Sequence, residues 1–391
     1  MKYNFDKVID RSGTSAEKVE GLKHIWGRTD LIPLWVADMD FATAPFVTDA
    51  IRKRCENEVL GYTGKPDSYY NAIINWVKQR YDLIVTKEVI NFVPGIVPGI
   101  GMAMNCFTQK GDKVMIQPPV YHPFAWVTTR NERTLVINPL KWENGMYRMD
   151  LDAFREQIKG CKLFILCNPH NPGGVVWTEA ELRAIADICY DEKVLVFSDE
   201  IHADLTLPPH THRPFATVSE KARMNSVTFM SPSKAFNMPG LSASHALIFN
   251  EDLRKRFRIY MDAGELDMGH VFAFLSVEAA YSHGTELLDQ CLAYIQGNID
   301  FVDEFLKKHA PKIKAIRPEA SYLVWLDCRE LELSQKDLNE FFVDKAHLAL
   351  NDGEMFGKEG IGFMRLNVAS PRCIIEKAMK QLADAYQLYI K

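Results

Sequence analysis

The sequence predicts an α/β fold in two parts, a large domain built on a mostly parallel sheet and a smaller α+β domain. The first indication is an alternation of short apolar runs with helical segments, which is typical of a parallel sheet covered by helices on both faces. Seven such runs occur, at residues 89–93, 113–116, 135–137, 163–167, 194–197, 227–230 and 245–249. We therefore expect a seven-stranded sheet in a three-layer αβα arrangement. The second indication is the length of 391 residues, which exceeds what one hydrophobic core usually organises.

The third indication is that the alternation lapses beyond about Tyr281. A different order of elements follows: a long helical stretch at 286–307, a strand-like run at 321–326, a helix at 335–346, a second strand-like run at 362–367 and a final amphipathic helix. We expect residues 51–285 to form the large domain and residues 286–391 the smaller α+β domain. Residues 1–50 are expected to be an N-terminal segment of the smaller domain.

Composition limits the classes of partner. The formal net charge is −5 and no basic block occurs, which argues against a nucleic-acid partner. The eight cysteines are scattered without a CxxC pair and indicate reduced thiols in a cytoplasmic protein. The first residues lack the apolar core of a signal peptide, and no apolar run approaches the length of a membrane span. We expect no membrane partner.

Lys234 is the first candidate for chemistry. It lies with Ser231 and Ser233 in a turn-rich connection between the last two apolar runs. A lysine amine can condense with an aldehyde, and hydroxyl groups can hold an anion, so this combination suggests pyridoxal phosphate. Because most single lysines are solvated surface charges, the interpretation depends on the other strand ends.

Polar residues follow two other runs at the edge where ligands bind in parallel sheets. Asn171 lies in an Asn-Pro turn after residues 163–167, and Asp199 follows residues 194–197. An acid that ends a buried run is costly unless it is paired; capping a helix or forming an internal salt bridge is the alternative explanation. About one βαβ unit separates Asn171 from Asp199 and Asp199 from Lys234. An amide, an acid and an amine at one edge would suit the phenolate oxygen, ring nitrogen and aldehyde of a pyridine aldehyde.

Three further stretches offer binding groups. The glycine-rich turn that contains Ile96 and Val97 is either an anion site at a helix start or only a tight turn. Tyr121, between prolines, could present its ring face to a planar ligand or could simply pack. Arg365 lies in an apolar strand context, where arginine usually pairs with a carboxylate, either structural or that of a substrate.

Two acids and a group of histidines have competing explanations. Asp38 and Asp40 interrupt an apolar and aromatic run just before Pro45, so they either cap the following helix or belong to the active site. His202, His210 and His212 suggest a metal ion, but the last two lie in a segment that resembles an exposed loop, and we expect no metal site.

In order along the chain, these stretches resemble the fold-type I pyridoxal phosphate enzymes of the aminotransferase superfamily, and more narrowly the MalY/PatB-type cystathionine β-lyases. The resemblance runs essentially from end to end. It rests on seven stretches, at residues 35–41, 61–62, 94–98, 168–172, 198–202, 231–234 and 365–372.

The resemblance implies roles for residues that handle the cofactor ring. Lys234 would anchor pyridoxal phosphate and later act as general base. Asp199 would pair with the ring nitrogen, Asn171 would hydrogen-bond the phenolate oxygen, and Tyr121 would stack on the ring. His202 occupies the position at which many aminotransferases have a tyrosine beside the cofactor.

The resemblance also implies how the phosphate and the substrate are held. Ser231, Ser233 and the amides of Ile96 and Val97 would bind the phosphate. Tyr62 would reach the site of a neighbouring subunit, which implies a homodimer with shared active sites. In the family, substrate contacts come from the arginine, tryptophan and tyrosine that correspond to Arg365, Trp35 and Tyr62.

The chain departs from the family pattern at three places. Gly173-Gly174 replaces a more usual Thr-Gly or Val-Gly pair, Ser242 stands where many aminotransferases have a phosphate-binding arginine, and residues 284–288 lack a tryptophan. The function implied is β-elimination from L-cystathionine or a related cysteine S-conjugate, giving a thiol, pyruvate and ammonia. Transamination of an amino acid is the alternative, and a regulatory protein that keeps the fold and binds a protein partner is a further one.

Overall fold

The large sheet contains all seven strands that the apolar runs predict. A computed structural model describes residues 2–389. Its seven-stranded sheet has the spatial order β2 (Ile90–Val93), β10 (Ser244–Leu247), β9 (Ser226–Met230), β8 (Leu195–Asp199), β7 (Cys161–Cys167), β3 (Lys113–Ile116) and β4 (Thr134–Ile137). β10 runs antiparallel to both of its neighbours, and the other pairs are parallel. The predicted α/β class is confirmed.

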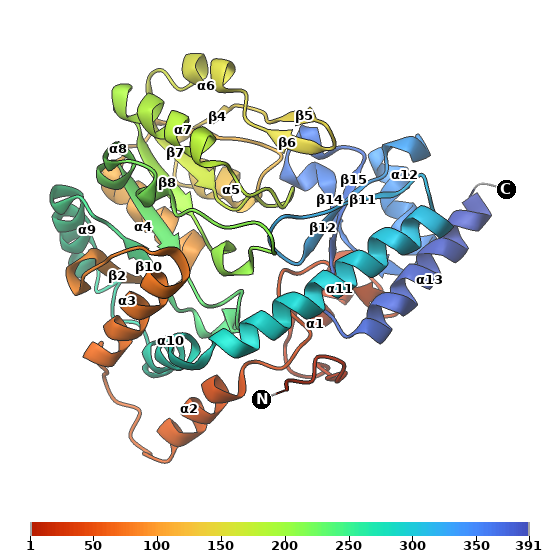
Figure 1. Cartoon of the computed structure of the whole chain (residues 1–391), viewed down its shortest axis with the longest axis horizontal. Helices are drawn as coiled ribbons and strands as arrows, with labels where there is room; N and C mark the ends of the chain where they lie inside the picture. Colours follow the sequence, from red (N-terminus) through yellow and green to blue (C-terminus); the bar gives the residue numbers. More distant parts are fainter. Residues whose placement is uncertain (1, 390–391) are drawn as a thin grey trace.

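Helices cover both faces of this sheet (Figure 1). Alternate residues of β3 show why: Val114 and Ile116 belong to one apolar cluster, and Met115 to another. The first cluster is closed by α4 (Ile96–Phe107), α5 (Pro123–Arg130) and α9 (Glu251–Ala263). The opposite face is covered by α3 (Asp67–Tyr81), α6 (Leu151–Gln157), α7 (Glu179–Asp191), α8 (Glu220–Met224) and α10 (Val271–His283). Strands that are buried on both faces read as continuous apolar runs, which is why the sequence revealed them.

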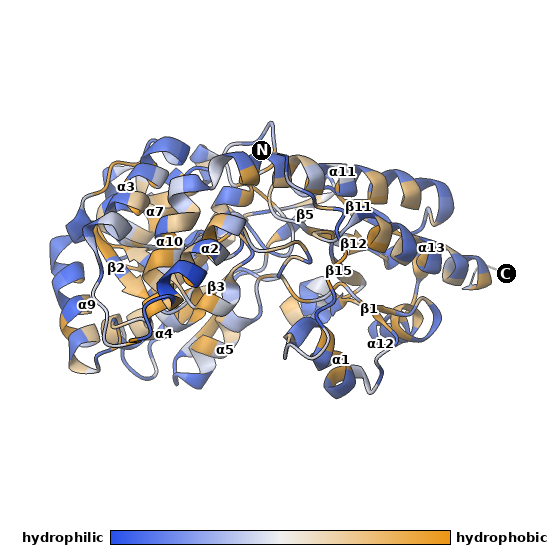
Figure 2. Cartoon of the chain, turned by 90° about the horizontal axis from the view of Figure 1, so that it is seen from below, coloured by the Kyte–Doolittle hydropathy of each residue, from blue (hydrophilic) through white to orange (hydrophobic). Residues whose placement is uncertain are grey.

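The C-terminal part has its own antiparallel sheet. It contains β11 (Lys314–Ile316), β12 (Leu323–Asp327), β15 (Phe363–Asn367) and β14 (Asn351–Asp352), in that order, with α11 (Thr285–His309), α12 (Gln335–Glu340) and α13 (Arg372–Tyr389). Helix α12 continues as a π-helical turn at Phe341–Lys345, within the predicted helix. α11 and α13 lie side by side along this part (Figure 1), and Figure 2 shows apolar residues gathered along the strands and the inner faces of the helices.

The N-terminal segment contacts both parts. After α1 (Glu17–Trp26), strand β1 (Ile32–Pro33) pairs in parallel with β13 (Leu348–Ala349). Helix α2 (Pro45–Cys55) packs instead against α10 of the large part. A small hairpin, β5 (Lys141–Glu143) and β6 (Met146–Arg148), completes the strands. The predicted boundaries at residues 50 and 285 stay a prediction.

Asp38 and Asp40 have a role that the sequence did not reveal. Helix α2 begins at Pro45 without a capping side chain. Instead, Asp38 binds Arg11 at 2.6 Å and Asp40 binds the fully buried Lys18 at 2.8 Å. Helix capping, one of the two explanations considered for these acids, was therefore wrong, because they pair with cations from a segment more than twenty residues upstream. Within residues 2–389, no helix combines the length and the apolar character needed to cross a membrane.

Candidate active site

A cavity of about 200 Å³ lies at the ends of β7 and β8, and residues of the connection between β9 and β10 form part of its wall. Its wall brings together residues that are far apart in the sequence. They are Ala37, Pro94 to Pro98, Tyr121, Cys167, Asn171, Asp199, Ile201, His202, Ser233, Lys234, Pro239 and Ser242 to Ser244. Strand ends of an α/β sheet are the expected place for a ligand, and eight of the predicted site residues lie on this wall.

Lys234 lies in the turn after β9, as predicted. Its Nζ donates a hydrogen bond to the carbonyl oxygen of Ala37. Burial, with the nearby positive charge of Arg365, lowers the pKa of Lys234 to about 8. A much larger fraction of this amine is therefore neutral near pH 7 than of an exposed lysine, and only the neutral amine can attack an aldehyde or take a proton.

Asp199 is the last residue of β8, and its side chain is buried. One carboxylate oxygen accepts a hydrogen bond from the backbone N–H of Ile201 at 3.0 Å, and no cationic side chain of residues 2–389 forms a salt bridge with it. Burial raises the pKa of Asp199 to about 7. The internal salt bridge that we considered is not present among these residues, so the carboxyl group is placed to receive a cation from a ligand.

Asn171 lies beside Asp199 because β7 and β8 are neighbours, with Cys167 opposite Asp199. Its Oδ1 accepts a hydrogen bond from Nη1 of Arg365 at 3.0 Å, and its backbone N–H contacts the thiol of Cys167 at 3.4 Å. None of residues 2–389 accepts a hydrogen bond from the Nδ2 of Asn171. The arginine therefore fixes the orientation of the amide, and its N–H donors remain for a ligand oxygen.

Arg365 lies on β15 and is almost fully buried. Its Nη2 donates to Asn351 Oδ1 at 2.5 Å and to the Trp35 carbonyl at 3.2 Å, and the guanidinium lies over the ring of Phe356. Among residues 2–389 no carboxylate pairs with it, and its Nε has no partner. A buried cation held only by neutral oxygens is a strong site for a substrate carboxylate.

The N-terminus of α4 and several hydroxyl-bearing residues form the remaining polar wall. The predicted residues Ile96, Val97 and Ser233 line the cavity there, together with Ser242 and Ser244. The first turn of α4 leaves backbone N–H groups without helical partners, which favours an anion. Tyr121 also lines the cavity, close enough to Arg365 and Asp199 for their charges to affect its pKa, which burial raises.

His202 lines the cavity as a neutral ring. It is buried, its Nδ1 has no partner among residues 2–389, and burial lowers its pKa to about 3. The neighbouring histidines do not join it, because His212 Nε2 is hydrogen-bonded to the Glu200 carboxylate at 2.8 Å and His210 lies near Glu319. Within residues 2–389, no group of three potential metal-binding side chains converges.

Four predicted residues do not line the cavity: Arg365, which reaches the wall through its hydrogen bond to Asn171, and Ser231, Trp35 and Tyr62. The Ser231 hydroxyl donates to the Ala243 carbonyl at 2.7 Å and accepts from the Ser233 N–H at 3.1 Å, so it braces the turn. The Trp35 ring packs against Trp26, and its Nε1 donates to the Lys18 carbonyl. Tyr62 is 97% exposed, in the loop between α2 and α3.

Sequence reasoning missed several contributors. Ala37 offers a backbone carbonyl, which no side-chain pattern reveals, and Cys167 was counted only as the end of an apolar run. Asn351, which accepts a hydrogen bond from Arg365, lies in the two-residue strand β14. This strand is too short to show the alternation of apolar and polar residues that identifies a strand in a sequence. Ser242 was noted only as the absence of an arginine, but it lines the cavity itself.

The donor set fits pyridoxal phosphate. A buried carboxyl group without a cation suits a protonated ring nitrogen, an amine of lowered pKa suits the aldehyde, and helix N–H groups with serine hydroxyls suit a phosphate. The carboxyl group, the amine and the phosphate donors all lie on the same wall. Within residues 2–389, no other side chain takes the place of the ring nitrogen, the aldehyde or the phosphate.

Comparison with known proteins gives consistent matches over almost the full length. The aminotransferase class I and II family matches residues 29–382. Cystathionine beta-lyase PatB of Bacillus subtilis is 38% identical over 384 residues, which cover 98% of this chain and 99% of that protein. A PLP-bound putative aminotransferase from Clostridium difficile 630 is similar with a TM-score of 0.96 and 40% identity, covering 98% of this chain and 100% of that one. The PLP-bound C-S lyase from Staphylococcus hominis has a TM-score of 0.91 and 35% identity, with 98% of each chain covered.

Proposed function

The chain belongs to the class I and II aminotransferase family, and from this premise we propose that it is a pyridoxal phosphate-dependent carbon–sulfur β-lyase acting on L-cystathionine or a related cysteine S-conjugate. The observation that carries the proposal is the buried Arg365 guanidinium, which has no carboxylate partner among residues 2–389 and touches Asn171 on the cavity wall. It gives an α-amino acid a carboxylate site beside the Lys234 amine. The similarity to PatB and to a C-S lyase favours carbon–sulfur cleavage.

Each residue then has a defined task around the cofactor, which supplies an electron sink for the pair of electrons left when the Cα proton is removed. Asp199 would hold the ring nitrogen in its protonated form, because a carboxylate favours a nearby positive charge. Asn171 would donate its amide N–H to the phenolate oxygen, and Tyr121 would present its ring face. Ser233 and the first turn of α4 would hold the phosphate.

Lys234 moves the proton. Because its pKa is about 8, the Lys234 amine can accept the Cα proton near neutral pH and return a proton later. Arg365 fixes the substrate carboxylate and thereby the direction in which the Cα–H bond points. The neutral ring of His202 fills the wall beside this site without adding charge.

We also propose that two copies share their sites. Tyr62 lies in a loop with two further exposed apolar side chains, Val59 at 71% and Leu60 at 60%. Contiguous apolar groups at the tip of a projecting loop favour a protein contact. Tyr62 would then complete the phosphate end of the neighbouring cavity, and Trp35 would reach the substrate only through its backbone carbonyl on Arg365.

An aminotransferase is the second candidate, since a similar structure carries that description and both reactions need Lys234, Asp199 and Arg365. The deciding experiment incubates the enzyme with L-cystathionine and no keto acid. Release of a thiol and pyruvate in equal amounts is expected. Turnover that appears only when a keto acid is added would establish transamination and overturn the lyase proposal.

A further inference from the structure

A short irregular stretch, residues 35–41, lies between the turn that carries Lys234 and the strand that carries Arg365. We refer to it as the bridging segment. It has no regular secondary structure, yet its backbone holds both functional cations. The Trp35 carbonyl accepts a hydrogen bond from Arg365 Nη2 at 3.2 Å, and the Ala37 carbonyl accepts from Lys234 Nζ. An irregular backbone needs other groups to fix it, because it lacks the regular backbone hydrogen bonds of a helix or a sheet.

Two buried or partly buried asparagines fix the bridging segment from its two sides. Asn237, three residues after Lys234, donates from Nδ2 to the Met39 and Phe41 carbonyls at 2.9 and 2.7 Å and accepts from the Met39 N–H at 3.0 Å. Asn367, two residues after Arg365, donates to the Val36 and Asp38 carbonyls at 2.6 and 2.7 Å. Its Oδ1 accepts from the Ala369 N–H at 2.8 Å.

The placement of these asparagines follows from the elements that carry them. Arg365 and Asn367 are two apart on β15, so both side chains leave the same face of the strand. Asn237 has a positive φ of 51° in the Lys234 turn, a conformation that asparagine tolerates. Each asparagine amide uses both of its N–H donors on two carbonyls of one segment, a fixed geometry that a single hydroxyl cannot reproduce.

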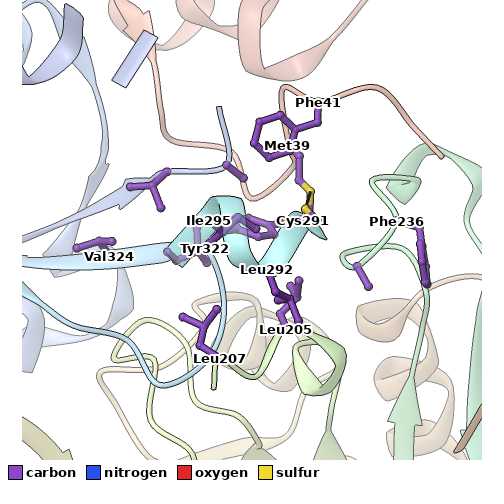
Figure 3. Close-up of a cluster of buried hydrophobic side chains, with 14 of the residues drawn as sticks. Met39, Phe41, Leu205, Leu207, Phe236, Cys291, Leu292, Ile295, Tyr322 and Val324 are labelled. Atoms are coloured by element: carbon purple, nitrogen blue, oxygen red, sulfur yellow. Dashed lines mark hydrogen bonds between the residues drawn. The ribbon is translucent and has the colours of Figure 1, made fainter. Parts of the chain in front are cut away.

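Packing reinforces the arrangement. Met39 and Phe41 are buried, and Figure 3 shows them in the apolar cluster with Cys291 of α11 and with Tyr322. The Tyr322 hydroxyl donates to the Ala37 carbonyl at 2.9 Å. The segment is thus fastened at its apolar side chains as well as at its backbone.

We propose that Asn237 and Asn367 are positioning residues that, through the bridging segment, set the position of the Lys234 amine relative to the Arg365 guanidinium. The inference rests on the proposed function for what these two cations do, and on the hydrogen bonds and packing of the bridging segment for how they are held. On this proposal, the backbone carbonyls of Trp35 and Ala37 help to position the two cations in the active site. Loss of either asparagine would let these carbonyls drift from both cations.

The experiment uses Asn237→Ala and Asn367→Ala with Asn298→Ala as a matched control. Asn298 is fully buried, donates to two carbonyls, Val368 and Ser370, both at 2.9 Å, and accepts from Arg372 Nε at 2.8 Å. It therefore has the same hydrogen-bonding pattern but does not touch the bridging segment. All three variants are expected to lose similar thermal stability.

The distinguishing measurement is the pH dependence of the rate at which the apo protein takes up pyridoxal phosphate, followed by absorbance. Uptake requires a neutral Lys234 amine, and the Ala37 carbonyl favours its protonated form. The apparent pKa of uptake is expected to fall by about one unit in Asn237→Ala and Asn367→Ala, since a hydrogen bond to a charged group is lost. In Asn298→Ala it should not move. Stability losses like those of Asn298→Ala without any shift in the uptake pKa would overturn the proposal.

A second measurement follows the Arg365 end of the segment. The KM for L-cystathionine is expected to rise about ten-fold in both bridging variants, with a smaller change in kcat, and to stay within two-fold in Asn298→Ala. If the alanine variants do not fold, Asn237→Ser and Asn367→Ser replace them, because each keeps one hydroxyl donor. These serine variants should show smaller shifts in the uptake pKa and in KM. If they show no such shifts, the proposal is overturned. Absence of carbon–sulfur cleavage in the unaltered enzyme would refute the proposed function, whereas the uptake measurement would still decide the role of the asparagines.

Discussion

At the scale of single residues, burial of Asp199 has a measurable cost. The pKa of this carboxyl rises from its ordinary value of 3.8 to about 7, so the folded apo protein binds more protons than the unfolded chain between those values. Its stability must therefore fall as pH rises through this window. In the proposed role of Asp199, a bound cofactor would reverse the penalty, because its ring nitrogen would place a cation beside the carboxylate.

This argument gives the first prediction. Asp199→Asn keeps an acceptor for the Ile201 N–H but removes the ionisable group, so the apo variant should be more stable than the apo wild type. The gain should be about 2–3 kcal/mol larger at pH 8 than at pH 5, measured by denaturant unfolding of both apo proteins. Cofactor affinity should drop in the same variant. An equal gain at both pH values would mean that Asp199 is not protonated in the apo protein.

Arg365 gives the second prediction at this scale. Removal of the guanidinium in Arg365→Ala should raise the KM for L-cystathionine about 100-fold, because a charge-assisted pair is lost. Arg365→Lys should recover only part of this, since an ammonium cannot make the same planar contacts. Steady-state kinetics of both variants, with the cofactor absorbance as a control for an intact site, measure the effect. Unchanged saturation with substrate would show that the arginine is purely structural.

At the scale of elements, the turn between β9 and β10 divides its two serines between different tasks. Ser231 braces the turn through Ala243 and the Ser233 N–H, whereas Ser233 lines the cavity. A turn that holds a reactive lysine needs such bracing because its backbone has few regular hydrogen bonds.

The third prediction separates these tasks. Ser231→Ala should lower the stability of the apo protein by about 1–2 kcal/mol, with a small loss of cofactor affinity. Ser233→Ala should leave apo stability nearly unchanged but weaken pyridoxal phosphate binding about ten-fold, because a phosphate donor is lost. Thermal unfolding and equilibrium dialysis of the two variants test this. The reverse pattern would show that Ser231, as the family resemblance implies, faces the phosphate.

The sequence predicted the large sheet well because its strands are buried on both faces and therefore appear as continuous apolar runs. The positions of Asn171, Asp199 and Lys234 could be predicted from the same regularity, since strand ends meet at one edge. By contrast, the partners of Asp38 and Asp40 lie at Arg11 and Lys18, and no local pattern identifies a pair that forms only in the tertiary fold. Backbone contributors such as the Ala37 carbonyl have no side-chain signature at all.

At the scale of the whole molecule, the shared site is the feature that a single copy does not display. Tyr62 is 97% exposed and does not line its own cavity, although the loop that carries it projects from between α2 and α3 (Figure 1). If it completes the site of a second copy, the two copies form a closed symmetric dimer in which each loop serves the other subunit. Sedimentation of the holoenzyme should then show a dimer.

The last prediction tests that exchange directly with hybrid dimers. Lys234→Ala and Tyr62→Ala chains, each expected to have little activity alone, are co-expressed with different tags, and the hybrid is purified by both tags. In the hybrid, one cavity carries both defects, while the other combines an intact lysine with an intact tyrosine from the partner. About half of wild-type activity should therefore return.

A second hybrid, of Lys234→Ala with Asp199→Ala, provides the matched control. Both of these residues line the cavity of their own chain, so each subunit of this hybrid keeps a defective site and no activity should return. Recovery in the first hybrid but not in the second is possible only if Tyr62 acts across the interface. If neither hybrid recovers although both form dimers, Tyr62 serves its own subunit, and the proposal of shared sites fails while the roles of Lys234 and Asp199 stand.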